Sequence, residues 1–222
     1  MPTIAIIGAG PGLGLALARR FGREGFAVAL IARNPATLET LVSDLDARGI
    51  RAAAFVADAG DPAAIGRALD DARSRFGSVD VLEFSPYSAG PGSMVSPVDV
   101  TLEALRPVVE SHLYGAVAAI ENVLPHMRNA DAGTILLTAG IGSIDPVPVF
   151  GTLNTAQAAT RNLALNLHGA LAGTGVYVGH VAIGVFIGED APEGWPHRSP
   201  ADVADELWAM HVARDERERV IA

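Results

Sequence analysis

Short apolar runs alternate with longer amphipathic segments along most of the chain. The apolar runs are bounded by glycine, proline or polar residues, and such runs are typical of strands buried on both faces of a parallel sheet. The longer segments repeat their apolar residues at helical spacing, which predicts helices that bury one face. The predicted strands cover residues 4–7, 27–32, 52–57, 79–84, 134–138, 176–181 and, near the end of the chain, 219–221.

Proline and glycine mark the ends of the predicted helices. Pro35, Pro62 and Pro200 stand at first helical positions, where a fixed φ angle suits the helix and no backbone donor is lost. Strands that alternate with helices predict a doubly wound parallel sheet with right-handed crossovers, whose ligand lies at the carboxyl ends of the strands. The predicted helices cover residues 13–22, 35–49, 62–77, 101–127, 148–171 and 200–214.

Composition narrows the class of protein. The 222 residues are 50% hydrophobic and 18% charged, which suits one folded domain over residues 1–222 and excludes disorder. The absence of cysteine excludes disulfides and thiol chemistry, and the six histidines lack metal-ligand spacing, so we expect no metal. A net charge of −9 disfavours nucleic acid and anionic membranes. Without a membrane span or the basic start of a signal peptide, we expect a cytoplasmic protein.

A glycine-rich turn joins the first predicted strand to the first helix. Gly8, Gly12 and Gly14 fit the spacing Gly-x-x-x-Gly-x-Gly, in which glycines allow a tight turn and a close approach to a pyrophosphate. The N-terminus of the helix then supplies backbone donors and positive potential. We expect dinucleotide binding here, and the alternative is a plain tight turn. The residues assigned to this site are Gly8, Gly10, Pro11, Gly12, Leu13 and Gly14.

The ends of the second and third strands bear on the choice of cofactor. Arg33 and Asn34 follow Ala32 at the place where an acidic residue would favour NAD. A guanidinium suits a 2′-phosphate, so NADP is predicted and NAD is the less favoured cofactor. The alternative is a solvated arginine in a turn. Asp58 and Ala59 are expected near the adenine, although Asp58 could also be an ordinary turn or cap residue.

Over essentially its whole length the chain resembles the short-chain dehydrogenase/reductase family. The resemblance implies a single doubly wound Rossmann-type α/β domain with a mostly parallel seven-stranded sheet flanked by helices. It also implies a nicotinamide cofactor, with Gly184 at its site, and oligomers built on two long helices. It rests on the three glycines of the turn, Asp58, Val79-Asp80-Val81-Leu82, Gly115, Gly133-Thr134-Ile135 and Gly184.

The catalytic set that the resemblance implies is missing. The family uses Asn, Ser, Tyr and Lys, the last two as Tyr-x-x-x-Lys, and this chain contains no lysine. The best match places Leu153 at the Tyr position and Gln157 at the Lys position. Gly140 then stands at the Ser position and His112 at the Asn position. We therefore interpret the chain as a divergent member, in which Gln157 can still bond a ribose hydroxyl but Leu153 cannot donate a proton.

Two other side chains are candidates for the missing acid, and a third could orient a carbonyl. His112 is the first choice, because an imidazole with a pKa near ~6.5 can exchange a proton at neutral pH. Tyr87 follows the fourth strand and is the second choice. Thr138 ends the fifth strand, and its hydroxyl could orient a carbonyl by donating a hydrogen bond. Each also has a structural alternative, as a packed helix histidine, a surface tyrosine or a turn residue.

Two functions remain open. The first is an NADP-dependent oxidoreductase acting on a small, neutral, fairly apolar carbonyl or alcohol, beneath a lid that carries Phe186 and Trp195. The second is a non-redox NADP-binding scaffold or regulatory protein. Residues 113–124 and 156–171 are apolar beyond one face, so we also expect a dimer or tetramer. Three acids in the lid disfavour an anionic substrate: Glu189, Asp190 and Glu193.

Overall fold

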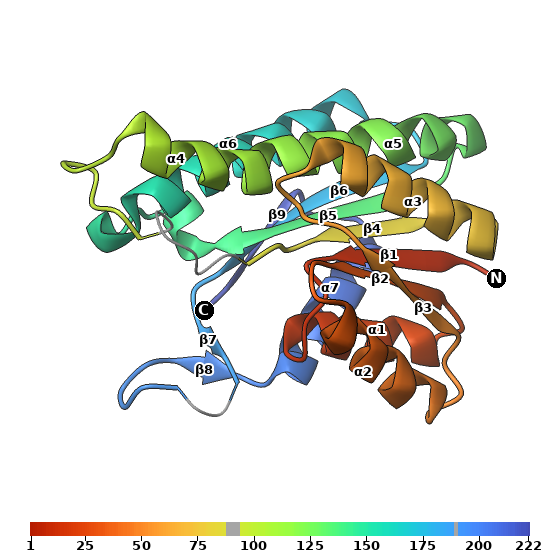
Figure 1. Cartoon of the computed structure of the whole chain (residues 1–222). Helices are drawn as coiled ribbons and strands as arrows, with labels where there is room; N and C mark the ends of the chain where they lie inside the picture. The colour runs from red at the N-terminus through yellow and green to blue at the C-terminus, as the bar shows by residue number, and fades with distance from the viewer. Residues whose placement is uncertain (88–93, 189–190) are drawn as a thin grey trace.

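A seven-stranded parallel sheet forms the centre of the molecule (Figure 1). The computed structural model describes residues 1–87, 94–188 and 191–222. The strand order is β3-β2-β1-β4-β5-β6-β9, and β7 and β8 form a separate two-stranded ribbon. In chain order the strands are β1 (Thr3–Ile7), β2 (Ala27–Ala32), β3 (Ala52–Val56), β4 (Val81–Phe84), β5 (Gly133–Gly140), β6 (Val176–Ile183), β7 (Phe186–Ile187), β8 (His197–Arg198) and β9 (Glu218–Ile221).

Helices cover both faces of the sheet. In Figure 1, α3, α4, α5 and α6 lie above the sheet and α1, α2 and α7 lie below it. The predicted single Rossmann-type α/β domain with seven strands is confirmed. Within the described residues, no helix is both long and apolar enough to cross a membrane. The helices are α1 (Leu13–Arg23), α2 (Pro35–Asp46), α3 (Pro62–Phe76), α4 (Leu102–Val109), α5 (Gly115–Ala130), α6 (Gly151–Ala170) and α7 (Pro200–Ala213).

Two predicted helices differ from those observed. The helix predicted over residues 101–127 is divided by a π-helical turn, Glu110–Tyr114, into α4 and α5. A π turn adds one residue to a helix without changing its apolar character, so the periodicity does not reveal it. The helix predicted from Pro148 starts as a 3₁₀ turn, Pro148–Phe150, and α6 begins at Gly151.

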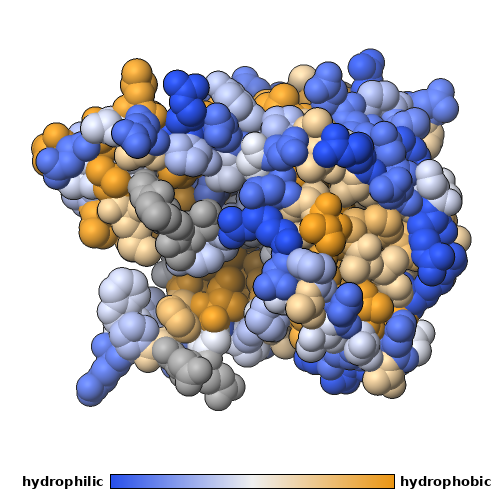
Figure 2. Space-filling model, in the orientation of Figure 1, coloured by the Kyte–Doolittle hydropathy of each residue, from blue (hydrophilic) through white to orange (hydrophobic). Residues whose placement is uncertain are grey.

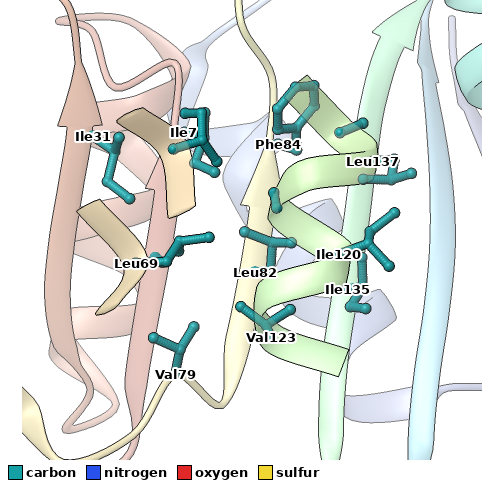
Figure 3. Close-up of a cluster of buried hydrophobic side chains, with 14 of the residues drawn as sticks. Ile7, Ile31, Leu69, Val79, Leu82, Phe84, Ile120, Val123, Ile135 and Leu137 are labelled. Carbon is teal, nitrogen blue, oxygen red and sulfur yellow. The ribbon is translucent and has the colours of Figure 1, made fainter. Parts of the chain in front are cut away.

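The hydrophobic core consists of two layers separated by the sheet. Figure 3 shows part of the layer beneath α3 and α5, where Leu69 and Ile120 pack over side chains of β1, β4 and β5. The opposite layer lies between the sheet and α1, α2 and α7 and includes Leu17 and Leu207. Because both faces are covered, the central strands are apolar on both sides, which explains the continuous runs in the sequence. One acid, Glu83 in β4, interrupts this pattern.

Gly115 provides a test of the packing between α5 and the loop after β3. A Cβ at this position would lie 2.3 Å from the carbonyl oxygen of Ala59, and backbone cannot rotate away as a side chain can. We expect Gly115→Ala to lower the free energy of unfolding by about 1–3 kcal/mol, as overpacking does. Denaturant unfolding at constant pH measures this loss.

Gly66 in α3 is the matched control. A Cβ there would meet nothing within 4 Å, so alanine adds helix propensity without a clash. Gly66→Ala should raise the free energy of unfolding by about 0.5–1 kcal/mol. Equal stabilities of the two variants would contradict the close contact at Gly115.

Candidate functional site

A cavity of about 750 Å³ opens at the carboxyl edge of the sheet. Its walls come from the turn after β1, the end of β2, the loop after β3, the residues after β4, and the junction of α4 with the π turn. The strand order reverses between β1 and β4, and this switch point is where doubly wound sheets bind ligands. Figure 2 shows that the molecule is also hollowed at this edge, between the end near α4 and the projecting β7–β8 segment.

The glycine turn has the geometry of an anion cradle. Gly8 has a φ of +97°, and a Cβ there would lie 2.5 Å from the carbonyl oxygen of Ser85. A Cβ on Gly14 would lie 2.9 Å from the Cα of Ala9, so only glycine lets α1 start so close to β1. Gly12 caps α1 without any side-chain hydrogen bond and faces open space. Leu15 donates its N–H to the carbonyl oxygen of Gly10 at 2.9 Å, so among the described residues the N–H groups of Leu13 and Gly14 are the ones available to a pyrophosphate.

The other residues assigned to the turn have different environments. Gly8 and Gly10 line the cavity, and the side chain of Pro11 is exposed. Leu13 is half-buried and packs against the core layer under α1. The part of Leu13 suited to a ligand is thus its backbone at the start of the helix.

Arg33 and Asn34 lie side by side on the cavity wall. The side chain of Asn34 caps α2, since its Oδ1 accepts a hydrogen bond from the N–H of Thr37 at 3.1 Å. Arg33 is exposed, and within the described residues its guanidinium makes no hydrogen bond or ion pair with the protein. An arginine without a protein partner at a cavity rim is suited to an anionic ligand.

Asp58 and Ala59 also line the cavity. Asp58 Oδ1 accepts a hydrogen bond from the N–H of Gly60 at 2.9 Å, which makes it the first residue of an Asx turn. Its structural role is therefore observed, while the predicted contact of Asp58 and Ala59 with adenine stays a prediction.

The positions that the resemblance assigns to the family's Ser and Lys face each other. Gln157 Oε1 accepts a hydrogen bond from the N–H of Gly140 at 3.1 Å. Leu153 lies one turn earlier on α6 and is half-buried. None of these three side chains carries a transferable proton, so any acid must come from elsewhere. The remaining N–H donors of the Gln157 amide could still bind a ribose hydroxyl.

His112 lies inside the π turn and is only 4% exposed. Its Nδ1 is 3.1 Å from the carbonyl oxygen of Val108 and 3.0 Å from the hydroxyl of Ser111. Its Nε2 is buried without a hydrogen-bond partner among the described residues. Burial lowers the pKa of His112, which disfavours the protonated form that an acid needs. The predicted role of His112 in proton donation is untested, and its environment does not favour that role.

Tyr87 and the predicted lid lie near the same edge. Tyr87 lines the cavity and is 71% exposed, and residues 88–93 lie outside the described part of the chain. Gly184 follows β6 and donates its N–H to the carbonyl oxygen of Ile221 at 2.7 Å. Phe186 and Trp195 are both exposed. Of the three lid acids, Glu193 is exposed, whereas Glu189 and Asp190 lie outside the described residues.

Glu83 is a feature of this edge that the sequence analysis missed. It stands in β4 between Ile6 of β1 and Leu136 of β5, and it is fully buried. Its Oε1 accepts a hydrogen bond from Thr138 Oγ1 at 2.9 Å, and its Oε2 accepts one from Ser85 Oγ at 2.9 Å. Burial raises the pKa of Glu83 to about 7 from its ordinary 4.5. A lone acid within Val81-Leu82-Glu83-Phe84 was the signal that could have revealed it.

The fold and the edge cavity together define a Rossmann-type protein, and comparison with known proteins gives the family. A family model described as short chain dehydrogenase matches residues 2–191. The chain is 31% identical over 220 residues to 1-deoxy-11-beta-hydroxypentalenate dehydrogenase of Streptomyces exfoliatus, covering 91% of this chain and 77% of that one. It belongs to the short-chain dehydrogenase/reductase family, whose members use a nicotinamide cofactor.

Two solved structures show how closely the fold is shared. L-sorbose reductase from Gluconobacter frateurii, complexed with NADPH and L-sorbose, has a TM-score of 0.87 and 21% identity, covering 99% of this chain and 95% of that chain. A 3-oxoacyl-(acyl-carrier protein) reductase from Brucella melitensis with bound NAD also has a TM-score of 0.87 and 21% identity, covering 100% and 89%. One carries NADPH and the other NAD, so the fold alone does not determine the cofactor.

Replacement of Glu83 by glutamine tests the burial of its carboxyl group. Between pH 4.5 and about 7 the folded protein holds a proton that the unfolded chain has already released. As the pH rises from 4.5 to about 7, the free energy of unfolding of the unmodified protein should therefore fall by about 3 kcal/mol relative to that of Glu83→Gln. Above pH 7 the difference should stay constant. Denaturant unfolding of both proteins from pH 4 to pH 8.5 measures it.

Glu218→Gln gives a control of opposite sign. The guanidinium of Arg161 bonds the Glu218 carboxylate at 2.8 Å and holds its pKa below the ordinary value. The unmodified protein should therefore lose stability relative to Glu218→Gln as the pH falls through the lowered pKa. If Glu83→Gln and Glu218→Gln showed the same pH trend, the raised pKa of Glu83 would be disproved.

Proposed function

We propose that this protein is an NADP-dependent oxidoreductase that interconverts a carbonyl compound and an alcohol. One observation carries the proposal: the open glycine turn lies on the same cavity as the guanidinium of Arg33, which has no partner among the described residues. The first is suited to a pyrophosphate and the second to a 2′-phosphate. Together they match the pyrophosphate and the 2′-phosphate of NADP.

The described residues at this edge are chemically suited to the parts of the cofactor. The N-terminus of α1 would hold the pyrophosphate, Arg33 the 2′-phosphate, and the amide of Gln157 a ribose hydroxyl. Asp58 would border the adenosine part. Bound NADPH supplies a hydride, and the protein must position the carbonyl, exclude water and provide a proton to the oxygen.

A neutral, fairly apolar substrate is the class that the edge supports best. Phe186 and Trp195 are 40% and 60% exposed on the segment that carries β7 and β8. Figure 2 shows hydrophobic surface inside the hollow beside this segment. Aromatic side chains there could cover an apolar substrate and remove water from the reacting atoms.

Self-association is a further part of the proposal. Val117 on α5 is 43% exposed, and Ala118 and Leu124 are half-buried in the single chain. Leu163 and Leu167 on α6 are half-buried as well. A dimer or tetramer packed on these helices would cover the apolar surface.

Light scattering at micromolar concentration should give a multiple of 22.9 kDa, and a monomeric mass would contradict the proposal.

Arg33→Ala tests the cofactor assignment. NADPH should bind the unmodified protein more tightly than NADH, and the substitution should remove about 1.5–3 kcal/mol of that preference. Fluorescence titration with both cofactors measures the two dissociation constants. Arg67→Ala on α3 is the matched control, because Arg67 is exposed, does not line the cavity and should leave the preference unchanged. Equal affinity of the unmodified protein for NADPH and NADH would contradict the assignment of NADP as the cofactor.

Turnover of a panel of aldehydes and ketones with NADPH then separates oxidoreductase from non-redox protein. A non-redox role, as an NADP-binding scaffold or regulatory protein, is favoured by one observation: neither Leu153 nor Gln157 is a proton donor. Reduction of a neutral carbonyl compound would support the oxidoreductase function. Tight NADPH binding without turnover of any panel member would support a scaffold or regulatory role.

A further inference from the structure

A buried carboxyl group and two hydroxyls form a polar cluster at the carboxyl edge of β4 and β5. Glu83 is fully buried, whereas Ser85 and Thr138 are half-buried and bond its two oxygens. Ser85 also donates its N–H to the carbonyl oxygen of Ile7 at 2.9 Å, next to the glycine turn. These two hydroxyls therefore connect the buried carboxyl group, by hydrogen bonds, to the edge of the sheet.

We propose that Glu83 and Thr138 form the proton-delivery pair of this site. Thr138 is the catalytic residue that touches the reacting oxygen, and Glu83 is the positioning residue that supplies its proton. The inference rests on the proposed function and names the acid that Leu153 and Gln157 do not supply. By the alternation of side chains along β5, Thr138 shares a face with Gly140, the position where the resemblance places the family's serine.

Among the described residues, Glu83 has no partner besides these two hydroxyls. Its neighbours in the sheet are the apolar side chains of Ile6 and Leu136. Among the described residues, no charged group of the flanking strands and helices acts on its ionisation, which depends on burial and the two hydroxyls. A buried acid without a cation is costly, and a hydrophobic side chain would fill the position at lower cost. Such a group at a ligand-binding edge is characteristic of a functional site.

The direction of the hydrogen bonds depends on the protonation of Glu83. As a carboxylate, Glu83 accepts from both hydroxyls, and both hydrogen atoms point into the protein. As a carboxylic acid, it can donate to Thr138 Oγ1, because a distance of 2.9 Å suits either direction. The hydrogen of Thr138 is then released to bond a substrate oxygen. With a pKa near 7, both forms of Glu83 are populated at neutral pH.

Bound NADPH would supply a hydride to the carbonyl carbon, and the proton transfer from the protein balances it. As the C=O π bond breaks, Thr138 gives its hydroxyl proton to the substrate oxygen, which forms the new O–H bond. The carboxyl proton of Glu83 moves to Thr138 Oγ1 at the same time and restores the hydroxyl. Glu83 is left as a carboxylate and regains a proton from water through Ser85. In alcohol oxidation the same two protons move in the opposite direction.

Three substitutions test the pair in the turnover assay. Glu83→Gln keeps the shape of the side chain but has no proton to give, and Thr138→Val removes the hydroxyl. Each should lower kcat by about 10²-fold or more, the scale of a lost general acid. Thr138→Ser keeps the hydroxyl and should retain most of the activity. The inflection near pH 7 in the kcat profile should disappear in Glu83→Gln. Unchanged kcat and an unchanged pH profile in Glu83→Gln would overturn the pair.

A binding measurement tests the pair without turnover. NADPH covering Ser85 and Thr138 would exclude water and bring negative charge, so it should favour the protonated form of Glu83. The dissociation constant of NADPH for the unmodified protein should therefore rise as the pH increases through about 7. In Glu83→Gln this dependence should be absent, while the two proteins bind alike at pH 6.

The outcomes separate the pair from the proposed function. If NADPH binds with the same pH dependence in both proteins, the pair is wrong and the cofactor assignment stands. If the dependence is lost in Glu83→Gln but no carbonyl is reduced, Glu83 lies at the cofactor site, and both its role in proton delivery and the oxidoreductase function are wrong. Failure of NADPH to bind at any pH would overturn both.

Discussion

The shape of the sheet edge at the carboxyl ends of the strands depends on one backbone contact. It joins the ends of two strands that are distant in the sequence. At Gly8 the chain leaves β1 so close to the carbonyl group of Ser85 that a Cβ would overlap it. β1 and β4 meet at the point where the strand order reverses, and the turn towards α1 has to start within this narrow space. The anion cradle, the cavity and the Glu83 cluster all border this contact. A side chain at residue 8 would disturb all three, because they share the same backbone.

The order of strands and helices could be predicted because apolar periodicity and punctuation agree along the chain. Continuous apolar runs identify strands covered on both faces, and Pro35, Pro62 and Pro200 stand at observed helix starts. The π turn at His112 could not be predicted, since one inserted residue leaves composition unchanged. Nor does the sequence reveal that α6 begins only after a 3₁₀ turn.

The phosphate-binding half of the site was easier to predict than the reacting half. Glycines at fixed spacing and an arginine after β2 act through backbone geometry and charge, which a sequence shows directly. The reacting half depends on where side chains point and how deeply they are buried. His112 is a plausible acid by residue type, but burial lowers its pKa. Glu83 was overlooked because its significance comes from two hydroxyls, one of them 55 residues away in the chain.

The π turn has a consequence for helical phase. One extra residue rotates everything that follows it by about 100° around the helix axis. The segment can therefore direct α4 towards α6. After the turn it presents the small residues Gly115 and Ala119 to different neighbours, the loop after β3 and the core over the sheet. A continuous α-helix of the same sequence would keep a single apolar stripe for both halves. A single-residue deletion within Glu110–Tyr114 would thus act as a rotation of α5 against the sheet, rather than as a shortening of the helix.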